Sequence, residues 1–411
     1  MTMIYNHPMH ILLIHQAFTA IDEPGGTRHH EFARQLAALG HEITIISSPV
    51  SYLTGSKIST VRKEEQLNGR IRIIRTYTYP ALHKSFFHRI LSFLSFMISS
   101  FSQSLKVKGV DLVWGTTPPI FQAFTAWLVA RWKKIPFLLE IRDLWPAFAI
   151  AVGVLKNKML ISLSQQLEHF LYKHADQIIA NSPGFVEHIS RAGGENIRVF
   201  PNGSDVSFFN GPDQTNATRK NLGWHNKFVI LYAGAHGMSN DLEVVINAAK
   251  ILEKSEYIHF AFLGDGKEKK HLMKIANELN LNNVSFHDPV PKNEIAEFMH
   301  ASDACIAILK PIDMYKTTYP NKVFDYMAAE KPVILAIDGV IREVVETAEC
   351  GVFCEPGNSE AIAAAASRLQ KNPESALLMG KNGRVFLQKH FDRKIIVGDF
   401  ADMIKKMKVG H

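Results

Sequence analysis

A cation and a carboxylate stand three positions apart at the start of a predicted helix in YPNKVFDYMA, residues 319–328. Pro320 suits a helix entrance, which places Lys322 in the first turn and Asp325 about one turn further on nearly the same face. A lysine in the first turn opposes the helix dipole, and an anionic ligand bound there would offset that repulsion. An amphipathic helix on which the two charges merely pair would explain the apolar residues but not the lysine. We therefore predict a phosphate at Lys322 and a ribose diol at Asp325.

A glycine pair lies between the first predicted strand and its helix in PGGT, residues 24–27. Without a Cβ atom, Gly25 and Gly26 let the backbone approach a ligand closely, and the N-terminus of the following helix adds partial positive charge. The pattern indicates a loop on the phosphate side of a ligand, with a plain strand-to-helix turn as the alternative.

A second glycine-bearing loop follows a predicted strand in YAGAHGM, residues 232–238. Backbone N–H groups between Gly234 and Gly237 can receive a diphosphate, and His236 can donate a hydrogen bond to it. Most of the 19 histidines are expected on the surface or in the core. The place of His236 between two glycines favours contact with a ligand instead.

Charged residues also follow the apolar strand PFLLE, in EIRDLWP, residues 140–146. Residues at the carboxyl end of a parallel strand point toward the edge where ligands bind in open α/β sheets. There a guanidinium can meet phosphate and a carboxylate can orient sugar hydroxyls, which makes Arg142 and Asp143 candidate catalytic residues. A structural ion pair between the two is the alternative.

The elements that position these residues alternate between short apolar strands and helical patterns, which predicts βαβ units and mainly parallel sheets. The turn-rich segment PNGSDVSFFNGPDQTN separates two such series. The expected fold class is α/β, with two Rossmann-like domains facing across a cleft that holds the active site. The predicted domains are residues 1–205 and 206–390, and a final helix over 391–411 packs back toward the first. The predicted strands are 10–15, 42–47, 71–76, 111–114, 137–141, 176–180, 197–200, 228–233, 258–263, 284–286, 304–309 and 333–336.

The composition is that of a globular protein of 411 residues, 46% hydrophobic and 21% charged, with a net charge of +7 that suggests an anionic partner. The three cysteines are too few for a disulfide framework and indicate reduced thiols in the cytoplasm. The sequence contains no Walker loop, no G-x-G-x-x-G, no H-E-x-x-H, no G-x-S-x-G and no D-x-D. Sugar transfer here would therefore neutralise a diphosphate with cations and N–H groups, and we expect neither a metal nor a cofactor.

Through seven segments and their order, the chain resembles the retaining GT-B glycosyltransferases of family four. The resemblance is closest to the branch that builds bacterial O-antigen, capsule and exopolysaccharide, which includes fucosamine transferases. The resemblance covers nearly the whole chain and implies a nucleotide-sugar donor, with UDP as the first expectation. The segments are GGTRHHEFARQLAALGHEITII, EIRDLWP, ADQIIANSPGF, PNGSDVSFF, ILYAGAHG, FAFLGDG and NKVFDYMAAEKPVI.

The resemblance implies roles for the matching residues. Gly25 and Gly26 would face the donor diphosphate and sugar, whereas the loop from Gly234 to Gly237 and Lys322 would meet the diphosphate. The nucleotide-sugar set also includes His236, Gly264 and Asn321.

Two further implications concern the base and the sugar. The segment 286–290 would flank the base, with a backbone contact at Val290. In the E-x7-E motif of the family, Asp325 takes the place of the second acid, the ribose ligand, and Thr317 replaces the first acid, which touches the donor sugar. Because Arg142 and Asp143 stand where a family histidine is common, no histidine base is assigned.

The mechanism implied is a front-face displacement with retention, in which the leaving diphosphate takes the acceptor proton and Lys322 stabilises its charge. The serine-containing segment 90–105, followed by Lys106 and Lys108, predicts contact with an anionic membrane surface, and hence a polyprenyl-diphosphate-linked acceptor on the inner face of the plasma membrane. The charge is spread along the chain without a recognition motif, so nucleic acid is not expected as a partner. The alternatives are a non-hydrolysing nucleotide-sugar epimerase, separable by product analysis without acceptor, and a degenerate assembly partner, separable by nucleotide binding.

Overall fold

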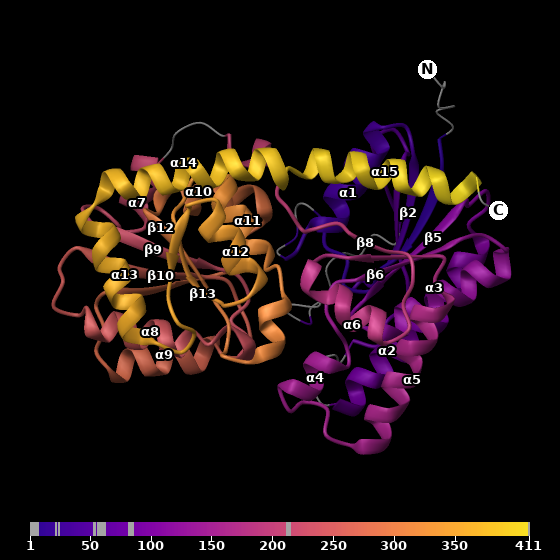
Figure 1. Cartoon of the computed structure of the whole chain (residues 1–411), viewed down its shortest axis with the longest axis horizontal. Helices are drawn as coiled ribbons and strands as arrows, with labels where there is room; N and C mark the ends of the chain where they lie inside the picture. The colour runs from indigo at the N-terminus through magenta and orange to yellow at the C-terminus, as the bar shows by residue number, and fades with distance from the viewer. Residues whose placement is uncertain are drawn as a thin grey trace. The chain divides into compact units, whose positions relative to one another are not determined.

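The computed structural model describes residues 8–20, 23, 25–51, 55, 63–80, 86–210 and 215–409. Within these ranges the chain forms two compact units (Figure 1). The N-terminal unit contains residues 8–20, 26–201 and 396–409, and the C-terminal unit contains residues 202–395 together with Glu23 and Gly25. The main unit divisions fall after residues 201 and 395. Pro24 of the first glycine loop lies outside the described residues.

A sheet of eight strands forms the centre of the N-terminal unit, in the order β3-β4-β2-β1-β5-β6-β7-β8. All neighbours are parallel except β3 and β4. The sequence did not predict β3, because KEEQ lacks apolar alternation and lies at the sheet edge. The strands are β1 (His10–Ile14), β2 (Glu42–Ser47), β3 (Lys63–Gln66), β4 (Ile71–Arg75), β5 (Leu112–Thr117), β6 (Phe137–Ile141), β7 (Gln177–Ala180) and β8 (Ile197–Val199).

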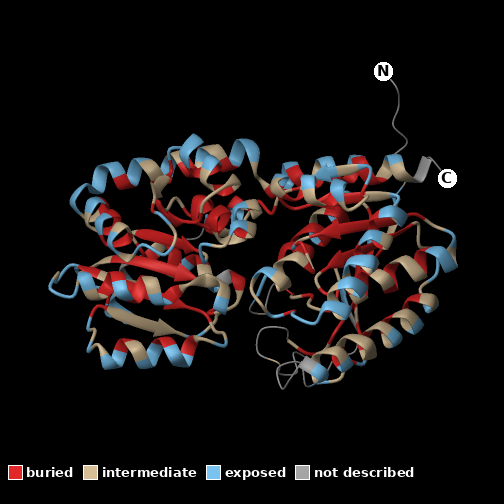
Figure 2. Ribbon diagram, turned by 60° about the horizontal axis from the view of Figure 1, so that its bottom comes forward, coloured by how far each residue is buried: buried red, intermediate tan, exposed pale blue. Residues whose placement is uncertain are grey.

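Helices pack on both faces of this sheet and expose their outer sides (Figure 2). On one face, the part of α15 from Ile396 onward joins α1, with Phe400 lying 5.6 Å from Phe32 and 5.0 Å from Trp114 between ring centroids. α3 contacts β5 and also packs against α2 and α5. The helices are α1 (Arg28–Ala38), α2 (Phe86–Lys106), α3 (Ile120–Lys133), α4 (Ala147–Ala151), α5 (Lys158–His174), the 3-10 turn η1 (Pro183–Phe185), α6 (Val186–Arg191) and α15 (Arg393–Val409).

The C-terminal unit is built on a fully parallel sheet of six strands, in the order β11-β10-β9-β12-β13-β14. Alternate residues of β9 serve two core clusters: Val229 and Leu231 belong to one, Ile230 and Tyr232 to the other. The sheet is therefore buried on both faces, as βαβ connectivity requires. The strands are β9 (Phe228–Ala233), β10 (Ile258–Leu263), β11 (Val284–His287), β12 (Ala304–Ile308), β13 (Val333–Ala336) and β14 (Gly351–Phe353).

The remaining elements connect and cover these strands. Each unit is thus a Rossmann-like α/β domain, and the expected fold class of two such domains is confirmed. The helices and 3-10 turns of the C-terminal unit are η2 (Val206–Phe209), α7 (Thr215–Asn221), η3 (Met238–Asn240), α8 (Leu242–Ile251), α9 (Lys269–Glu278), α10 (Lys292–Ala301), η4 (Asp313–Thr317), α11 (Asn321–Ala328), α12 (Val340–Thr347), α13 (Ser359–Lys371) and α14 (Pro373–His390).

Candidate functional site

Lys322 lies in the first turn of α11 in the C-terminal unit, among neutral groups. Its Nζ donates to the hydroxyl of Tyr232 at 2.7 Å, lies 3.4 Å from Asn240 Oδ1, and stands 3.9 Å from the centroid of the Tyr232 ring. Within the described ranges no carboxylate pairs with it, so the predicted alternative, a pair with Asp325, is wrong. Burial lowers the pKa of Lys322 to about 7. A half-buried cation without a counter-charge among the described residues is suited to bind an anion.

The glycine loop after β9 lies beside this lysine. A Cβ atom on Gly234, which has φ +148°, would be 3.1 Å from Lys322 Nζ. The hydroxyl of Tyr232 donates to the carbonyl of Ala235 at 2.7 Å, which ties the loop to the same side chain that accepts from Lys322. The C-terminal unit therefore brings together two of the predicted diphosphate contacts.

A second glycine loop, after β10, packs beneath the first. A Cβ atom on Gly264 would lie 2.0 Å from the carbonyl oxygen of Gly234, and one on Gly266 would lie 2.4 Å from that of His236. The backbone N–H of His236 also donates to Asp265 at 2.8 Å. Gly264 thus supports the loop of Gly234 through close backbone packing.

We expect Gly264→Ala to unfold this arrangement. The backbone at this position has a φ of +140°, which residues with a side chain rarely adopt, and the added methyl group would clash with the Gly234 carbonyl. The expected result is a loss of about 2 kcal/mol or more in the free energy of unfolding, together with loss of nucleotide binding. Thermal denaturation and calorimetry with UDP measure both. Gly223→Ala is the matched control, because Gly223 also has a positive φ, +69°, but a Cβ atom there meets nothing within 4 Å; equal melting temperatures for both variants would contradict the packing argument.

His236 does not present its ring at the surface of the loop. The side chain is fully buried, and its ring lies 5.8 Å from Tyr232, 6.3 Å from Phe262 and 6.3 Å from Phe286 between centroids. In the described part of the chain neither ring nitrogen has a hydrogen-bond partner, and burial, with Lys269 and Lys322 nearby, lowers the pKa to about 4. A neutral buried ring leaves the backbone of Gly234 to Gly237 as the part of this loop that can meet a ligand.

Asp325 is occupied by protein donors. Lys292 Nζ lies 2.7 Å from both carboxylate oxygens, Ser204 Oγ donates at 2.7 Å, and Asn321 Nδ2 donates at 3.1 Å. Asp325 and Lys292 are both buried. The predicted ribose ligand is therefore a buried structural ion pair in this structure, and a direct ribose contact would have to replace one of these donors.

The other predicted residues of this unit lie in surrounding loops. Thr317 ends η4 and donates to the carbonyl of Met314 at 2.7 Å. Val290, in the loop before α10, is half-buried against the core cluster that contains α11. Gly339, which the sequence analysis did not single out, fixes η4, because a Cβ atom there would lie 2.1 Å from the carbonyl oxygen of Lys316.

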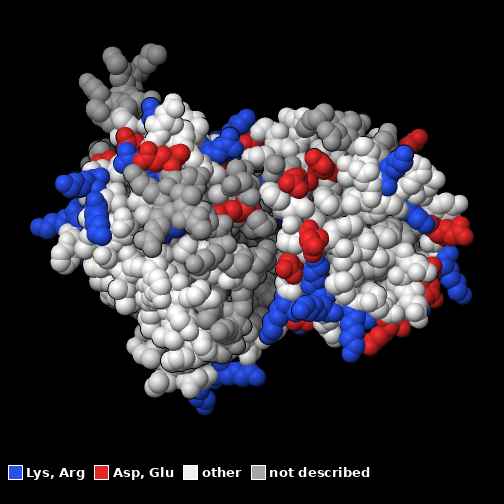
Figure 3. Space-filling view, turned by 180° about the vertical axis from the view of Figure 1, so that it is seen from behind, with Lys and Arg blue, Asp and Glu red and all other residues white. Residues whose placement is uncertain are grey.

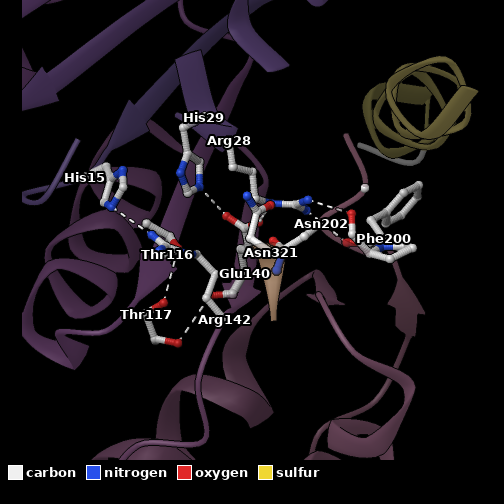
Figure 4. Close-up of polar contacts among 12 residues, drawn as sticks. His15, Arg28, His29, Thr116, Thr117, Glu140, Arg142, Phe200, Asn202 and Asn321 are labelled. Carbon is white, nitrogen blue, oxygen red and sulfur yellow. Dashed lines mark hydrogen bonds and ion pairs between the residues drawn. The ribbon is translucent and has the colours of Figure 1, made fainter. Parts of the chain in front are cut away.

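In the N-terminal unit, a buried carboxylate organises the end of β6 (Figure 4). Glu140 is fully buried and pairs with Arg28 at 3.0 Å and with His29 at 2.5 Å, both from the first turn of α1. Burial alone would raise the pKa of Glu140, but His29, Arg28 and Arg142 together hold it well below its ordinary value. Glu140 is therefore a carboxylate at neutral pH that joins α1 to β6.

Arg142 and Asp143 follow at the carboxyl end of the same strand. Arg142 Nη1 lies 3.0 Å from His15 Nε2, so the predicted alternative of a pair with Asp143 is not what holds this guanidinium. The Asp143 side chain is exposed beyond the end of β6. An arginine and a carboxylate thus follow the carboxyl end of β6, and their catalytic role stays a prediction.

The first glycine loop leads into α1 of this unit. Gly25 has φ +143°, a region that favours glycine, and Gly26 has no neighbour against its Cβ position. Thr27 donates to Glu31 within the first turn of α1. The loop therefore has both the backbone freedom and the open space that a close ligand approach requires.

Sequence reasoning missed several residues that the structure places beside the predicted ones. Lys292 had a readable signal: like Lys322, it follows a proline at the start of a helix, Pro291. His15 and His29 come together only through the order of the strands, so no local pattern reveals them. Among the described residues, no cluster of three His, Cys, Asp or Glu side chains is arranged to hold a metal ion.

Two protein-family models match the chain, one in each unit. The Glycosyl transferase 4-like domain matches residues 25–203, and Glycosyl transferases group 1 matches residues 214–386. The two Rossmann-like units and these matches define a GT-B glycosyltransferase. Its N-terminal unit carries a Glycosyl transferase 4-like domain, and its C-terminal unit carries a Glycosyl transferases group 1 domain.

Individual relatives agree with this class. The chain is 27% identical over 397 residues to WcaI of Escherichia coli (strain K12), a protein named as a putative colanic acid biosynthesis glycosyl transferase. The alignment covers 91% of this chain and 94% of WcaI. Sucrose-phosphate synthase from Thermosynechococcus elongatus superposes with a TM-score of 0.80 at 17% identity, over 98% of this chain and 100% of that one. HepE of Anabaena, solved in complex with UDP-glucose, gives a TM-score of 0.72 at 17% identity, over 97% of this chain and 100% of that one. The solved structures support the fold.

Within the described ranges, none of the helices combines the length and hydropathy that crossing a bilayer requires.

Proposed function

We propose that this enzyme moves a sugar from a UDP-linked donor to a lipid-linked saccharide, with retention of configuration, in the synthesis of a cell-surface polysaccharide such as O-antigen, capsule or exopolysaccharide. The observation that carries the proposal is the half-buried Lys322 beside the Gly234 loop at the start of α11, which has no carboxylate partner among the described residues. WcaI is named for colanic acid, and HepE was solved with UDP-glucose, which supports the polysaccharide product and the UDP-linked donor. Both family models describe glycosyl transferases, which disfavours the epimerase alternative.

The proposed donor site is metal-independent and uses cations and N–H groups. Lys322 and the N–H groups of residues 234–237 bind the diphosphate, and the start of α11 adds partial positive charge. As the glycosidic bond breaks, negative charge grows on the leaving diphosphate, where Lys322 stabilises it. In the same proposal, Arg142 and Asp143 act on the sugar or acceptor, and the diphosphate takes the acceptor proton.

Calorimetric titration with UDP and with GDP in EDTA tests the donor site. We expect UDP to bind, GDP to bind more weakly, and both to be lost in Lys322→Met. Incubation with a panel of UDP-sugars and polyprenyl-diphosphate-linked acceptors then tests transfer, and the anomeric coupling in the product tests retention. Absence of nucleotide binding in the wild type would overturn the proposal and favour a non-catalytic assembly partner.

An anionic membrane surface is the proposed location of the acceptor, and helix α2 supports it. Ser92, Ser100 and Ser104 are buried against the unit, whereas Phe87 is 67% and Ile98 is 68% exposed. Part of the outward face of this helix is therefore apolar, although Phe96 is buried and Ser102 is exposed. In Figure 3, the lower part of this unit shows a broad area without charged side chains, with Lys and Arg at its lower end. An uncharged, aromatic surface with flanking cations fits anionic lipid.

We expect Phe87→Ser/Ile98→Ser to weaken binding to vesicles that contain anionic lipid by at least about tenfold, since each apolar side chain lost removes roughly 1.5–3 kcal/mol of burial in the interface. Flotation of liposomes with and without phosphatidylglycerol measures this. Leu378→Ser is the matched control, because Leu378 is 59% exposed on α14 of the other unit. Equal flotation of all three proteins, or no dependence on anionic lipid, would count against the surface.

A further inference from the structure

The guanidinium of Arg142 is held by a neutral group. Its Nη1 lies 3.0 Å from Nε2 of His15, which follows β1 (Figure 4). Among the described residues, no Asp or Glu lies within ion-pair distance of Arg142. Glu140, two positions earlier, is already occupied by Arg28 and His29. The hydrogen-bond partner of Arg142 is therefore a neutral imidazole, while Glu140 and Asp143 act on its charge only from beyond ion-pair distance.

The hydrogen bond defines the proton position on His15. Arginine is a donor only, so His15 Nε2 must accept, and the single proton of a neutral imidazole must lie on Nδ1. That nitrogen is buried and has no hydrogen-bond partner in the described part of the chain. A buried donor without a partner lowers stability, and such groups persist where another requirement outweighs stability.

The ring of His15 is itself firmly held. The residue is 1% exposed, and its ring centroid lies 4.3 Å from that of His29 and 6.3 Å from that of Phe18. His29 is anchored in turn by Glu140. Burial, with His29 and Arg142 nearby, lowers the pKa of His15 well below its ordinary value, so the ring stays neutral.

We propose that His15 is a positioning residue for the transfer reaction: as a neutral acceptor it orients the Arg142 guanidinium and leaves its charge available to an anionic or hydroxyl-rich ligand. A carboxylate at this position would orient the guanidinium equally well but would neutralise it. The inference rests on the proposed role of Arg142 at the reacting groups. It adds to that role a residue that no local sequence pattern identifies.

Two substitutions at His15 separate orientation from packing. His15→Phe keeps a ring against His29 and removes the acceptor, whereas the amide oxygen of His15→Gln reaches the place of Nε2. With the UDP-sugar of the panel that the wild type turns over fastest, we expect His15→Phe to lower kcat by about tenfold with an unchanged donor KM, and His15→Gln to restore most of it. The UDP dissociation constant should not change, because that site lies in the other unit.

Phe18→Leu is the matched control for packing beside the same ring, and it should retain kcat. Full activity in His15→Phe, or parallel losses of kcat, KM and melting temperature in both His15 variants, would overturn the proposal. Arg142→Gln tests the role on which it rests: unchanged activity there would remove the role of Arg142 itself.

A spectroscopic test is independent of any substrate. In long-range ¹H–¹⁵N spectra of the histidine-labelled full chain, the resonance lost in His15→Gln should show a proton on Nδ1 and none on Nε2. A proton on Nε2 would exclude the bond to Arg142 and overturn the proposal. If the wild type turned over no nucleotide sugar, the proposed function would fail, whereas this spectrum would still decide how Arg142 is held.

Discussion

Lys322→Met is expected to weaken UDP binding by at least about tenfold and to lower turnover by more than about tenfold, because one charge-assisted contact to the diphosphate is lost in the ground state and in the transition state. The same variant should be more stable than the wild type without ligand. Nζ lies half-buried among Tyr232, Asn240 and the Gly234 loop with no counter-charge in the described part of the chain, and methionine fills a similar volume without that desolvation. We expect a melting temperature higher by a few degrees.

Differential scanning calorimetry and UDP titration measure the two effects on one preparation. Opposite signs, with stability up and binding down, would identify Lys322 as a residue kept for its ligand. A variant with normal turnover would refute the role of Lys322, and a variant that loses both stability and binding would show that the lysine holds the loop together. Lys274→Met, at an exposed position on α9, is the matched control and should change neither quantity.

Proton uptake gives this site a pH dependence with a definite sign. In the free protein the pKa of Lys322 is about 7, and a bound diphosphate stabilises the charged form and raises it. Binding above pH 7 therefore takes up a proton, and affinity falls as the pH rises through the window between the free and bound values. Titration with UDP at about pH 8, where its terminal phosphate is fully ionised, in buffers of different ionisation enthalpy should show uptake of up to one proton. Lys322→Met should show none.

The stability of the free protein follows the same linkage. The folded pKa of Lys322 is depressed, so the unfolded chain binds the extra proton at pH values between the folded and unfolded pKa. Stability from this group therefore rises as the pH increases from about 7 to about 10, the ordinary value for lysine. The methionine variant should lack that part of the slope.

The fold was largely predictable from the sequence because every strand except β3 and β14, the short strand Gly351–Phe353, carries its own signal. The β9 segment FVILYA is apolar at every position, as a strand buried on both faces must be, and the glycine loop follows it directly. The edge strand β3 was not predictable, because its residues Lys63–Gln66 carry no alternation and pair only through backbone groups.

The position of a candidate site residue was predictable where one sequence segment contains both the helix and the charged side chain that the helix carries. Lys322 could be read from α11 alone, because a proline and a first-turn lysine are local features. The partners of Asp325 could not be read, since Lys292 and Ser204 lie 33 and 121 residues away and meet it only in the folded unit. The surroundings of His236 could not be read for the same reason: its place between two glycines favours contact with a ligand, but the rings of Tyr232, Phe262 and Phe286 lie around the imidazole.

Asp325→Asn is expected to destabilise the C-terminal unit severely. The side chains of Asp325 and Lys292 are 10% and 5% exposed, so the substitution leaves a buried ammonium without its counter-charge. Removing one partner of a buried pair typically lowers the free energy of unfolding by about 3–5 kcal/mol. The double variant Asp325→Asn/Lys292→Met should recover a large part of that loss, because no buried charge then remains unpaired. Denaturant unfolding followed by fluorescence measures the cycle, and Lys274→Met, which breaks an exposed pair with Glu278, should change stability by less than about 1 kcal/mol.

The same variants decide between a structural and a ribose-binding carboxylate. If Asp325 bound ribose directly, the wild type would discriminate UDP from 2′-deoxy-UDP and the rescued double variant would not. If it acts through structure, the double variant should recover UDP affinity along with stability, since Lys322 and the Gly234 loop remain in place. The network extends from Asp325 through Ser204 to Arg393, whose backbone N–H donates to the Ser204 carbonyl at 3.1 Å. Asp325 thus connects α11, the helix that carries Lys322, to Ser204 and Arg393, which lie near the first and last residues of the C-terminal unit. Substitution of Asp325 should therefore affect nucleotide binding only as far as it displaces α11.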